Sequence, residues 1–146
     1  MKFSLEIGPK TDLETLPQLK DVYITMLPGG DYNETAEQAI KLVKKGCNPI
    51  PHFPARSIEN NNQLKDYVNK CIDGGVKQVL VIGGSREPVG QFDSSIQLLE
   101  TGYFEKMKIG IAGHPEGSPD ISDSNLEKAM KDKKPYADYI VTQWLL

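Results

Sequence analysis

Gln78-Val79-Leu80-Val81-Ile82-Gly83-Gly84 is apolar on both faces of a pattern that repeats every two residues. A strand with one face in water would place a polar residue at every second position, and this run does not. It therefore predicts a buried strand, with helices covering one face and the interior of a barrel on the other. The closing glycines are typical of a strand that ends in a turn.

Five further runs of similar character lie along the chain, and each ends on a glycine or a polar residue before a helix-forming stretch. From the third onward they begin roughly thirty residues apart, about the length of one strand-plus-helix unit. Strands that alternate with helical patterns predict a parallel sheet with right-handed connections. The five runs are Phe3-Ser4-Leu5-Glu6-Ile7, Val22-Tyr23-Ile24-Thr25, Cys47-Asn48-Pro49-Ile50-Pro51-His52, Ile109-Gly110-Ile111-Ala112-Gly113-His114 and Tyr139-Ile140-Val141-Thr142-Gln143.

The stretches between the strands predict five helices, of which the first is a short turn broken by Pro17. We therefore expect one domain over residues 1–146, an α/β fold of the parallel (β/α)8 TIM-barrel type that is incomplete, with about six strands and five helices. A doubly wound open sheet, a barrel completed by another chain and a truncated product all stay open. The helices are expected at 12–16, 33–45, 61–72, 92–99 and 124–133.

Composition narrows the function classes. A formal net charge of −3 gives no electrostatic reason to expect nucleic acid or an anionic membrane as a partner. The apolar runs have only the length of strands, so we expect no membrane-spanning helix. A charged residue interrupts the first residues before the apolar core of a signal peptide can build, so we expect no signal peptide. Cys47 and Cys71 lack the spacing of a metal site and are expected to be free thiols. We expect a cytoplasmic protein.

Polar and glycine residues stand where the predicted strands end. In parallel α/β folds the carboxyl ends of the strands meet at one rim, and active sites lie there. We therefore expect these residues to form one active site. They are Glu6, Thr25, His52, Gly84-Ser85, His114 and Gln143.

Taken in order, the motifs at these strand ends resemble the methylenetetrahydrofolate reductase family, over the first six strand-helix units of its flavin barrel. The resemblance implies an oxidoreductase of one-carbon metabolism and methionine biosynthesis. It would reduce 5,10-methylenetetrahydrofolate to the 5-methyl form with NAD(P)H, and hydride would pass through FAD. The motifs are Glu6 with Gly8-Pro9-Lys10, Thr25 with Leu27-Pro28-Gly29, Pro51-His52-Phe53-Pro54-Ala55-Arg56, Val81-Ile82-Gly83-Gly84, Ala112-Gly113-His114-Pro115-Glu116-Gly117-Ser118-Pro119 and Tyr139-Ile140-Val141-Thr142-Gln143-Trp144.

The resemblance also implies roles for single residues. Glu6 would be the catalytic acid that protonates N10 of the folate, buried in the mouth of the barrel. Gln143 would bind the substrate, together with Ser85, which stands where the family has an aspartate. The cofactor-binding residues would be Thr25, His52, Gly83, Gly84, Ser85, His114, Ser118 and Lys131.

Plainer interpretations stand beside these. Glu6 could be a solvent-facing strand residue, and His52 a core histidine satisfied by the backbone. A metal site of His52, His114 and Glu6 is a weak pattern, and we expect no metal. The alternative function is a truncated, non-catalytic relative that binds a small molecule or forms part of a barrel completed by another chain. As partners we expect a folate-type molecule, NAD(P)H and a second copy at the exposed sheet edges, but no nucleic acid and no membrane.

Overall fold

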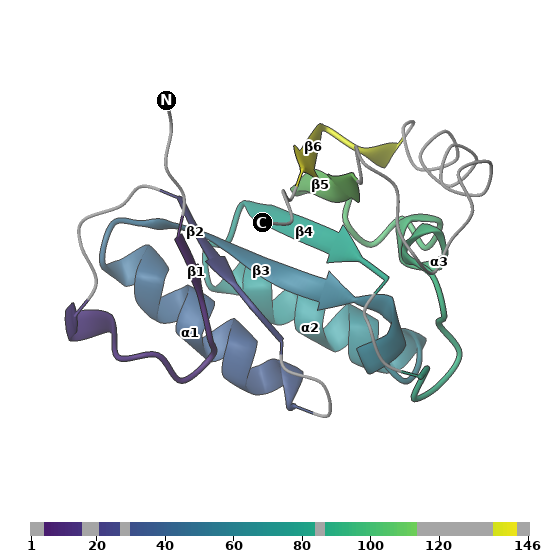
Figure 1. Ribbon diagram of the computed structural model, residues 1–146, viewed down its shortest axis with the longest axis horizontal. Helices are drawn as coiled ribbons and strands as arrows, with labels where there is room; N and C mark the ends of the chain where they lie inside the picture. The colour runs from purple at the N-terminus through teal and green to yellow at the C-terminus, as the bar shows by residue number, and fades with distance from the viewer. Residues whose placement is uncertain (1–4, 16–20, 27–29, 84–86, 114–135, 143–146) are drawn as a thin grey trace.

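The computed structural model describes residues 5–15, 21–26, 30–83, 87–113 and 136–142 (Figure 1). Within them six strands form one parallel sheet in the order β1-β2-β3-β4-β5-β6. The strands are β1 (Leu5–Ile7), β2 (Asp21–Ile24), β3 (Asn48–Pro54), β4 (Gln78–Ile82), β5 (Lys108–Gly113) and β6 (Tyr139–Thr142).

The strand order excludes one of the architectures that the sequence left open, the doubly wound sheet. Every strand pairs with the next strand along the chain, so the order never reverses. A doubly wound sheet contains such a reversal, whereas a barrel of the TIM type does not. The fold is therefore a parallel α/β sheet of the incomplete TIM-barrel type, as expected. The pairing of a second copy with the sheet edges stays a prediction.

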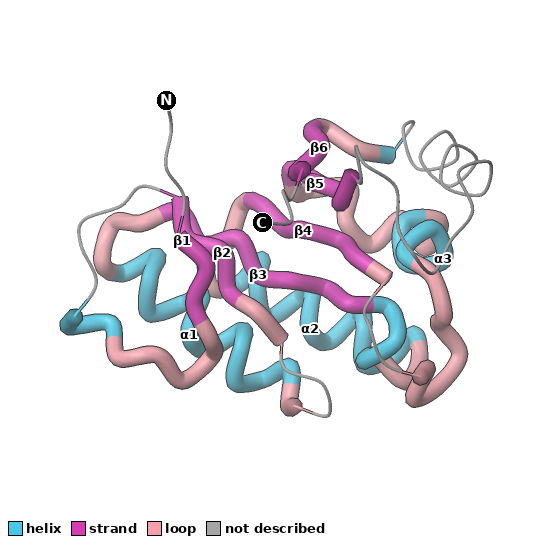
Figure 2. Tube along the Cα trace, viewed as in Figure 1, coloured by secondary structure: helices cyan, strands magenta, loops and turns pink. Residues whose placement is uncertain are grey.

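The described helices are α1 (Tyr32–Lys44), α2 (Asn61–Asp73) and the short α3 (Ser95–Leu99), with 3-10 turns at Leu13–Thr15 and Ala55–Ser57. Helices α1 and α2 lie side by side against one face of the sheet (Figure 2). The helix expected at 124–133 lies outside the described residues. No helix among the described residues has the length and hydropathy needed to cross a membrane.

Local chemistry sets the start of each helix. Helix α1 begins earlier than expected because the side chain of Asp31, rather than that of Asn33, caps it by accepting a hydrogen bond from the backbone N–H of Asn33. Helix α3 begins at Ser95 rather than near Phe92 because Ser94 and Gln97 form a capping box there.

The core lies between the helices and the face of the sheet that they cover. Phe53 of β3 stacks on Tyr67 of α2, with ring centres 3.8 Å apart and planes 15° apart. Cys71 is buried in this layer, Cys47 is half-buried, and both are free thiols. The core also includes Val22, Ile24, Ala36, Ala39, Leu42, Leu64, Val68, Val79, Val81 and Ile111.

Gly90 tests the packing of the loop after β4. A side chain at Gly90 would overlap the backbone of Glu59, whose carbonyl accepts a 2.9 Å hydrogen bond from the N–H of Gln91. We expect Gly90→Ala to lower the free energy of unfolding by about 2 kcal/mol, because backbone cannot move aside as a flexible side chain can.

Gly83→Ala is the matched control, since nothing lies within 4 Å of the methyl group it would add. We expect that variant to stay within about 0.5 kcal/mol of the wild type in urea denaturation. Equal stability of the two variants would contradict the packing described here.

Candidate functional site

The face of the sheet opposite α1 and α2 is the candidate functional site. Because side chains alternate along a strand, the residues next to Phe53 and the other helix-facing positions point to this second face. We call it the helix-free face. Its polar and aromatic members are Glu6, Asp21, Tyr23, Asn48, His52, Gln78, Lys108 and Tyr139.

His52 lies on β3 in the middle of this face. Tyr67 donates a 2.8 Å hydrogen bond to its backbone carbonyl, which ties this point of the strand to α2. The imidazole lies edge-on to the ring of Tyr23, with ring centres 6.2 Å apart. Burial lowers the pKa of His52 below 6.5, and the nearby charge of Glu6 acts in the opposite direction. The imidazole is therefore neutral at pH 7 and able to accept a proton.

Glu6 lies on β1 and pairs in register with Tyr23 of β2. Its side chain is exposed, so the expectation of a carboxyl buried in the mouth of a barrel is wrong. The strand at this edge of the sheet is only three residues long and leaves Glu6 open to water. What Glu6 supplies is a negative charge that favours the protonated form of His52.

Tyr23 and Tyr139 approach each other from opposite ends of the sheet. In a flat sheet β2 and β6 would lie roughly 19 Å apart, at about 4.8 Å per strand spacing, which is more than two tyrosine side chains span. Their hydroxyls nevertheless make a hydrogen-bonding contact, so the sheet is strongly curled. Burial raises the pKa of both phenols, and both stay neutral at physiological pH.

A polar network lies toward the amino ends of the strands on the same face. The side-chain amide of Asn48 donates to Asp21 at 3.1 Å and to Gln78 at 3.0 Å. Gln78 in turn makes a hydrogen-bonding contact with the hydroxyl of Tyr139. Sequence reasoning assigned no role to these residues, although each occupies an alternate position of a predicted strand. That alternation was the signal that could have placed them on one face.

Two more of the expected site residues are described, and both have structural contacts. Thr25 follows β2, where its N–H and hydroxyl donate to the carbonyl of Ile7, and its own carbonyl accepts from Thr35. The carbonyl of Gly83 accepts a 3.0 Å hydrogen bond from the N–H of Arg56, which joins the ends of β3 and β4. The remaining expected site residues lie outside the described part of the chain: Gly84, Ser85, His114, Ser118, Lys131 and Gln143.

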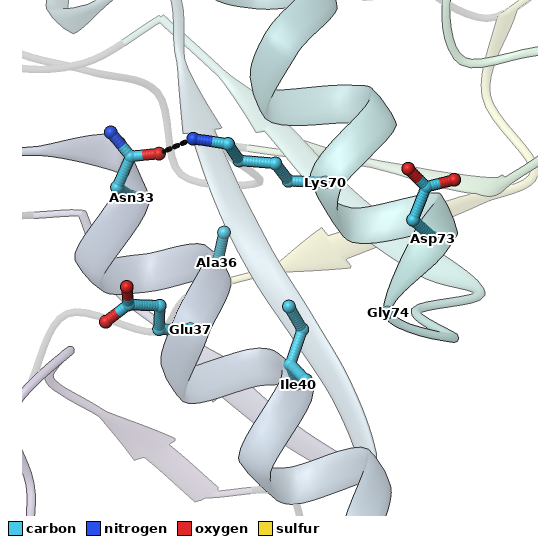
Figure 3. A pocket seen from close by; sticks show the side chains of 7 residues that line it. All are labelled: Asn33, Ala36, Glu37, Ile40, Lys70, Asp73 and Gly74. Carbon is cyan, nitrogen blue, oxygen red and sulfur yellow. Dashed lines mark hydrogen bonds between the residues drawn. The ribbon is translucent and has the colours of Figure 1, made fainter.

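A groove of about 330 Å³ lies on the other side of the molecule, between α1 and α2 (Figure 3). Its floor is tight, because a side chain at Gly74 would overlap Ile40. Lys70 at one end is engaged by Asn33 and by Asp66, the latter at 3.1 Å. The groove therefore does not offer this ammonium freely to a ligand. Across the described residues, no cluster of three His, Cys, Asp or Glu side chains could hold a metal ion.

Comparisons with known proteins support the fold and nothing finer. No family model matches the chain. Solved structures of Ruminococcus gnavus sialic acid aldolase match it, the wild type at 14% identity with a TM-score of 0.53, and the catalytic lysine mutant at 12% with 0.51. Both matches cover 86% of this chain and 43% of the aldolase, so the chain spans less than half of that protein's length. The Escherichia coli YdjI aldolase matches at 15% identity and a TM-score of 0.49.

These findings correct the family assignment. The resemblance to methylenetetrahydrofolate reductase is wrong, because no family model matches the chain and the similar structures named above are of an aldolase. The oxidoreductase activity falls with it, as do the FAD cofactor, the folate reduction with NAD(P)H and the link to methionine biosynthesis. The flavin and folate roles given to single residues rested on that family and are withdrawn. The positions themselves stay predictions.

The lowered pKa of His52 predicts how stability depends on pH. Above pH 6.5 both the folded and the unfolded chain carry a neutral imidazole. As the pH falls from 6.5 toward the lower folded value, the unfolded chain binds a proton that the folded chain does not. The free energy of unfolding therefore falls in this window, by at most about 1.4 kcal/mol per pH unit.

Urea denaturation between pH 7.5 and 5 measures this slope. His52→Gln should flatten it, whereas His114→Gln should keep the part that His52 contributes. A slope that is unchanged in His52→Gln would mean that the imidazole is as well hydrated in the folded chain as in the unfolded one.

Proposed function

We propose that this chain is part of a lyase of the aldolase type, which breaks or forms a carbon–carbon bond beside a carbonyl in a small hydroxylated substrate. The observation that carries the proposal is His52, a neutral and half-buried imidazole on the helix-free face of a barrel-type sheet. The fold that the chain shares with sialic acid aldolase supports the same reaction class.

His52 would act as the proton acceptor. In an aldol cleavage a base removes the proton from the hydroxyl group two carbons from the carbonyl. The new carbonyl forms as the carbon–carbon bond breaks, and the electron pair of that bond passes to the original carbonyl as an enolate. The enolate carbon then takes up a proton. A base with a pKa somewhat below neutrality suits the first step, because it is unprotonated at working pH.

Glu6 and Tyr23 would support that base. When His52 takes up the proton it becomes a cation, and the nearby carboxylate of Glu6 stabilises that cation. The Tyr23 ring, in an edge-type contact with the imidazole, would limit how far the imidazole can turn. Both residues thus act through His52, and we assign neither of them the bond-breaking step.

Lys108 also stands on the helix-free face. Its ammonium lies 5.4 Å from the centre of the Tyr139 ring, within range of a cation–π contact. Because its amine is engaged by that ring, we assign Lys108 no covalent role.

The test is an assay of the purified chain on a panel of small β-hydroxy carbonyl compounds, followed by detection of the two carbonyl fragments by mass spectrometry. We expect His52→Gln to lower kcat/KM by about 10²-fold or more, as for loss of a general base. Glu6→Gln should have a smaller effect, because it removes a charge near the base and leaves the base in place.

Glu37→Gln is the control, since Glu37 is an exposed carboxylate on α1, away from the helix-free face. We expect it to keep wild-type turnover. Cleavage that survives unchanged in His52→Gln would reject His52 as the base. Failure to cleave any member of the panel would count against the lyase itself.

A further inference from the structure

Tyr139 lies across the curled sheet rather than standing out from it. Tyr139 pairs in register with Gly110 of the neighbouring strand β5. A side chain at Gly110 would overlap the Tyr139 ring. The hydroxyl reaches one strand further and donates to the carbonyl of Val79 on β4 at 3.2 Å. The missing side chain at Gly110 is therefore what lets the ring lie flat over β5.

Tyr23 of β2 extends over the same face of the sheet from the opposite direction. Its hydroxyl meets that of Tyr139, and its ring makes an edge-type contact with the imidazole of His52, with the planes at 66°. No described helix lies over this face, yet Ile50 and Leu80 of β3 and β4 are only 1% and 6% exposed. The ring of Tyr139 lies over Gly110, the β5 residue that pairs with Leu80, and Tyr23 pairs with Ile50, so both tyrosines stand beside these water-excluded positions.

We propose that Tyr23 and Tyr139 form a positioning pair, which holds the imidazole of His52 in place and keeps water from its buried side. The inference rests on the proposed function only in taking His52 as the proton acceptor. The two tyrosines touch no reacting atom and act through His52. Their effect would be to set how readily that imidazole takes up a proton.

Several charged groups face the same region. Their effects on His52 must be separated from the effect of the two tyrosines. Glu6 on β1 favours protonation of His52, and the carboxylate of Asp21 on β2 acts on both phenols. Lys108 on β5 lies over the Tyr139 ring. A useful variant therefore leaves all three charges in place and removes only the aromatic cover.

The experiment is an NMR titration of the histidine side chains in the full chain. The protein has two histidines, His52 and His114, so His114→Gln assigns the spectrum. Tyr139→Ala removes the ring, Tyr139→Phe keeps the ring but loses the hydroxyl, and Gly110→Ala displaces the ring while leaving Tyr139 present. Tyr136→Ala is the control, because Tyr136 is an exposed tyrosine three residues before Tyr139.

We expect Tyr139→Ala and Gly110→Ala to raise the pKa of His52 toward 6.5 by about half a unit or more, since water then reaches the imidazole. Tyr139→Phe should recover most of the wild-type value because its ring still covers the site. Tyr136→Ala should leave the titration unchanged.

An unchanged pKa of His52 in both Tyr139→Ala and Gly110→Ala would overturn the proposal, as would an equal shift in Tyr136→Ala. If Tyr139→Ala does not fold, Gly110→Ala decides, with far-ultraviolet circular dichroism as the check on folding. The titration uses no substrate. A chain that cleaves no aldol but shows these shifts would therefore reject the proposed function and retain the positioning pair.

Discussion

The stack of Phe53 on Tyr67 determines which way β3 faces, and the helix-free face depends on that orientation. With Phe53 turned toward α2, the two-residue alternation of a strand sends His52 to the opposite side. The hydroxyl of Tyr67 strengthens the same arrangement by bonding to the backbone carbonyl of His52. One buried aromatic pair thus places the imidazole, and a shift of β3 by one residue would exchange the histidine for an apolar side chain.

Much of the fold was predictable from local patterns. The apolar runs gave the strands to within a few residues, and their regular spacing gave the parallel connections. The ends of the helices were harder, because the choice between Asp31 and Asn33 as cap depends on backbone angles that composition does not reveal. The barrel-type fold was predicted, but the contacts of Tyr139 with residues of β2 and β4 were not, because they join strands that are not neighbours in the sequence.

The candidate site was only partly predictable. His52 was expected in the site from its place at the end of a predicted strand, but the side chains around it were not. The strand-end motifs misled the family assignment for a physical reason. Every parallel barrel brings polar residues and glycines to the carboxyl ends of its strands, so six such ends in order characterise the architecture rather than one chemistry. Asn48 and Gln78 were missed because they lie toward the opposite ends of their strands.

The order of the strands also bears on how the chain reaches this structure. Every strand pairs with the strand next to it in the sequence, so each pairing closes a loop of modest length. Such a sheet can grow from the amino terminus as the chain is synthesised, one strand-helix unit at a time. The contact between Tyr23 and Tyr139 is different, because it joins the second of the described strands to the sixth. It can form only when β3, β4 and β5 are in place between them, so the environment of the imidazole would mature after those strands have paired.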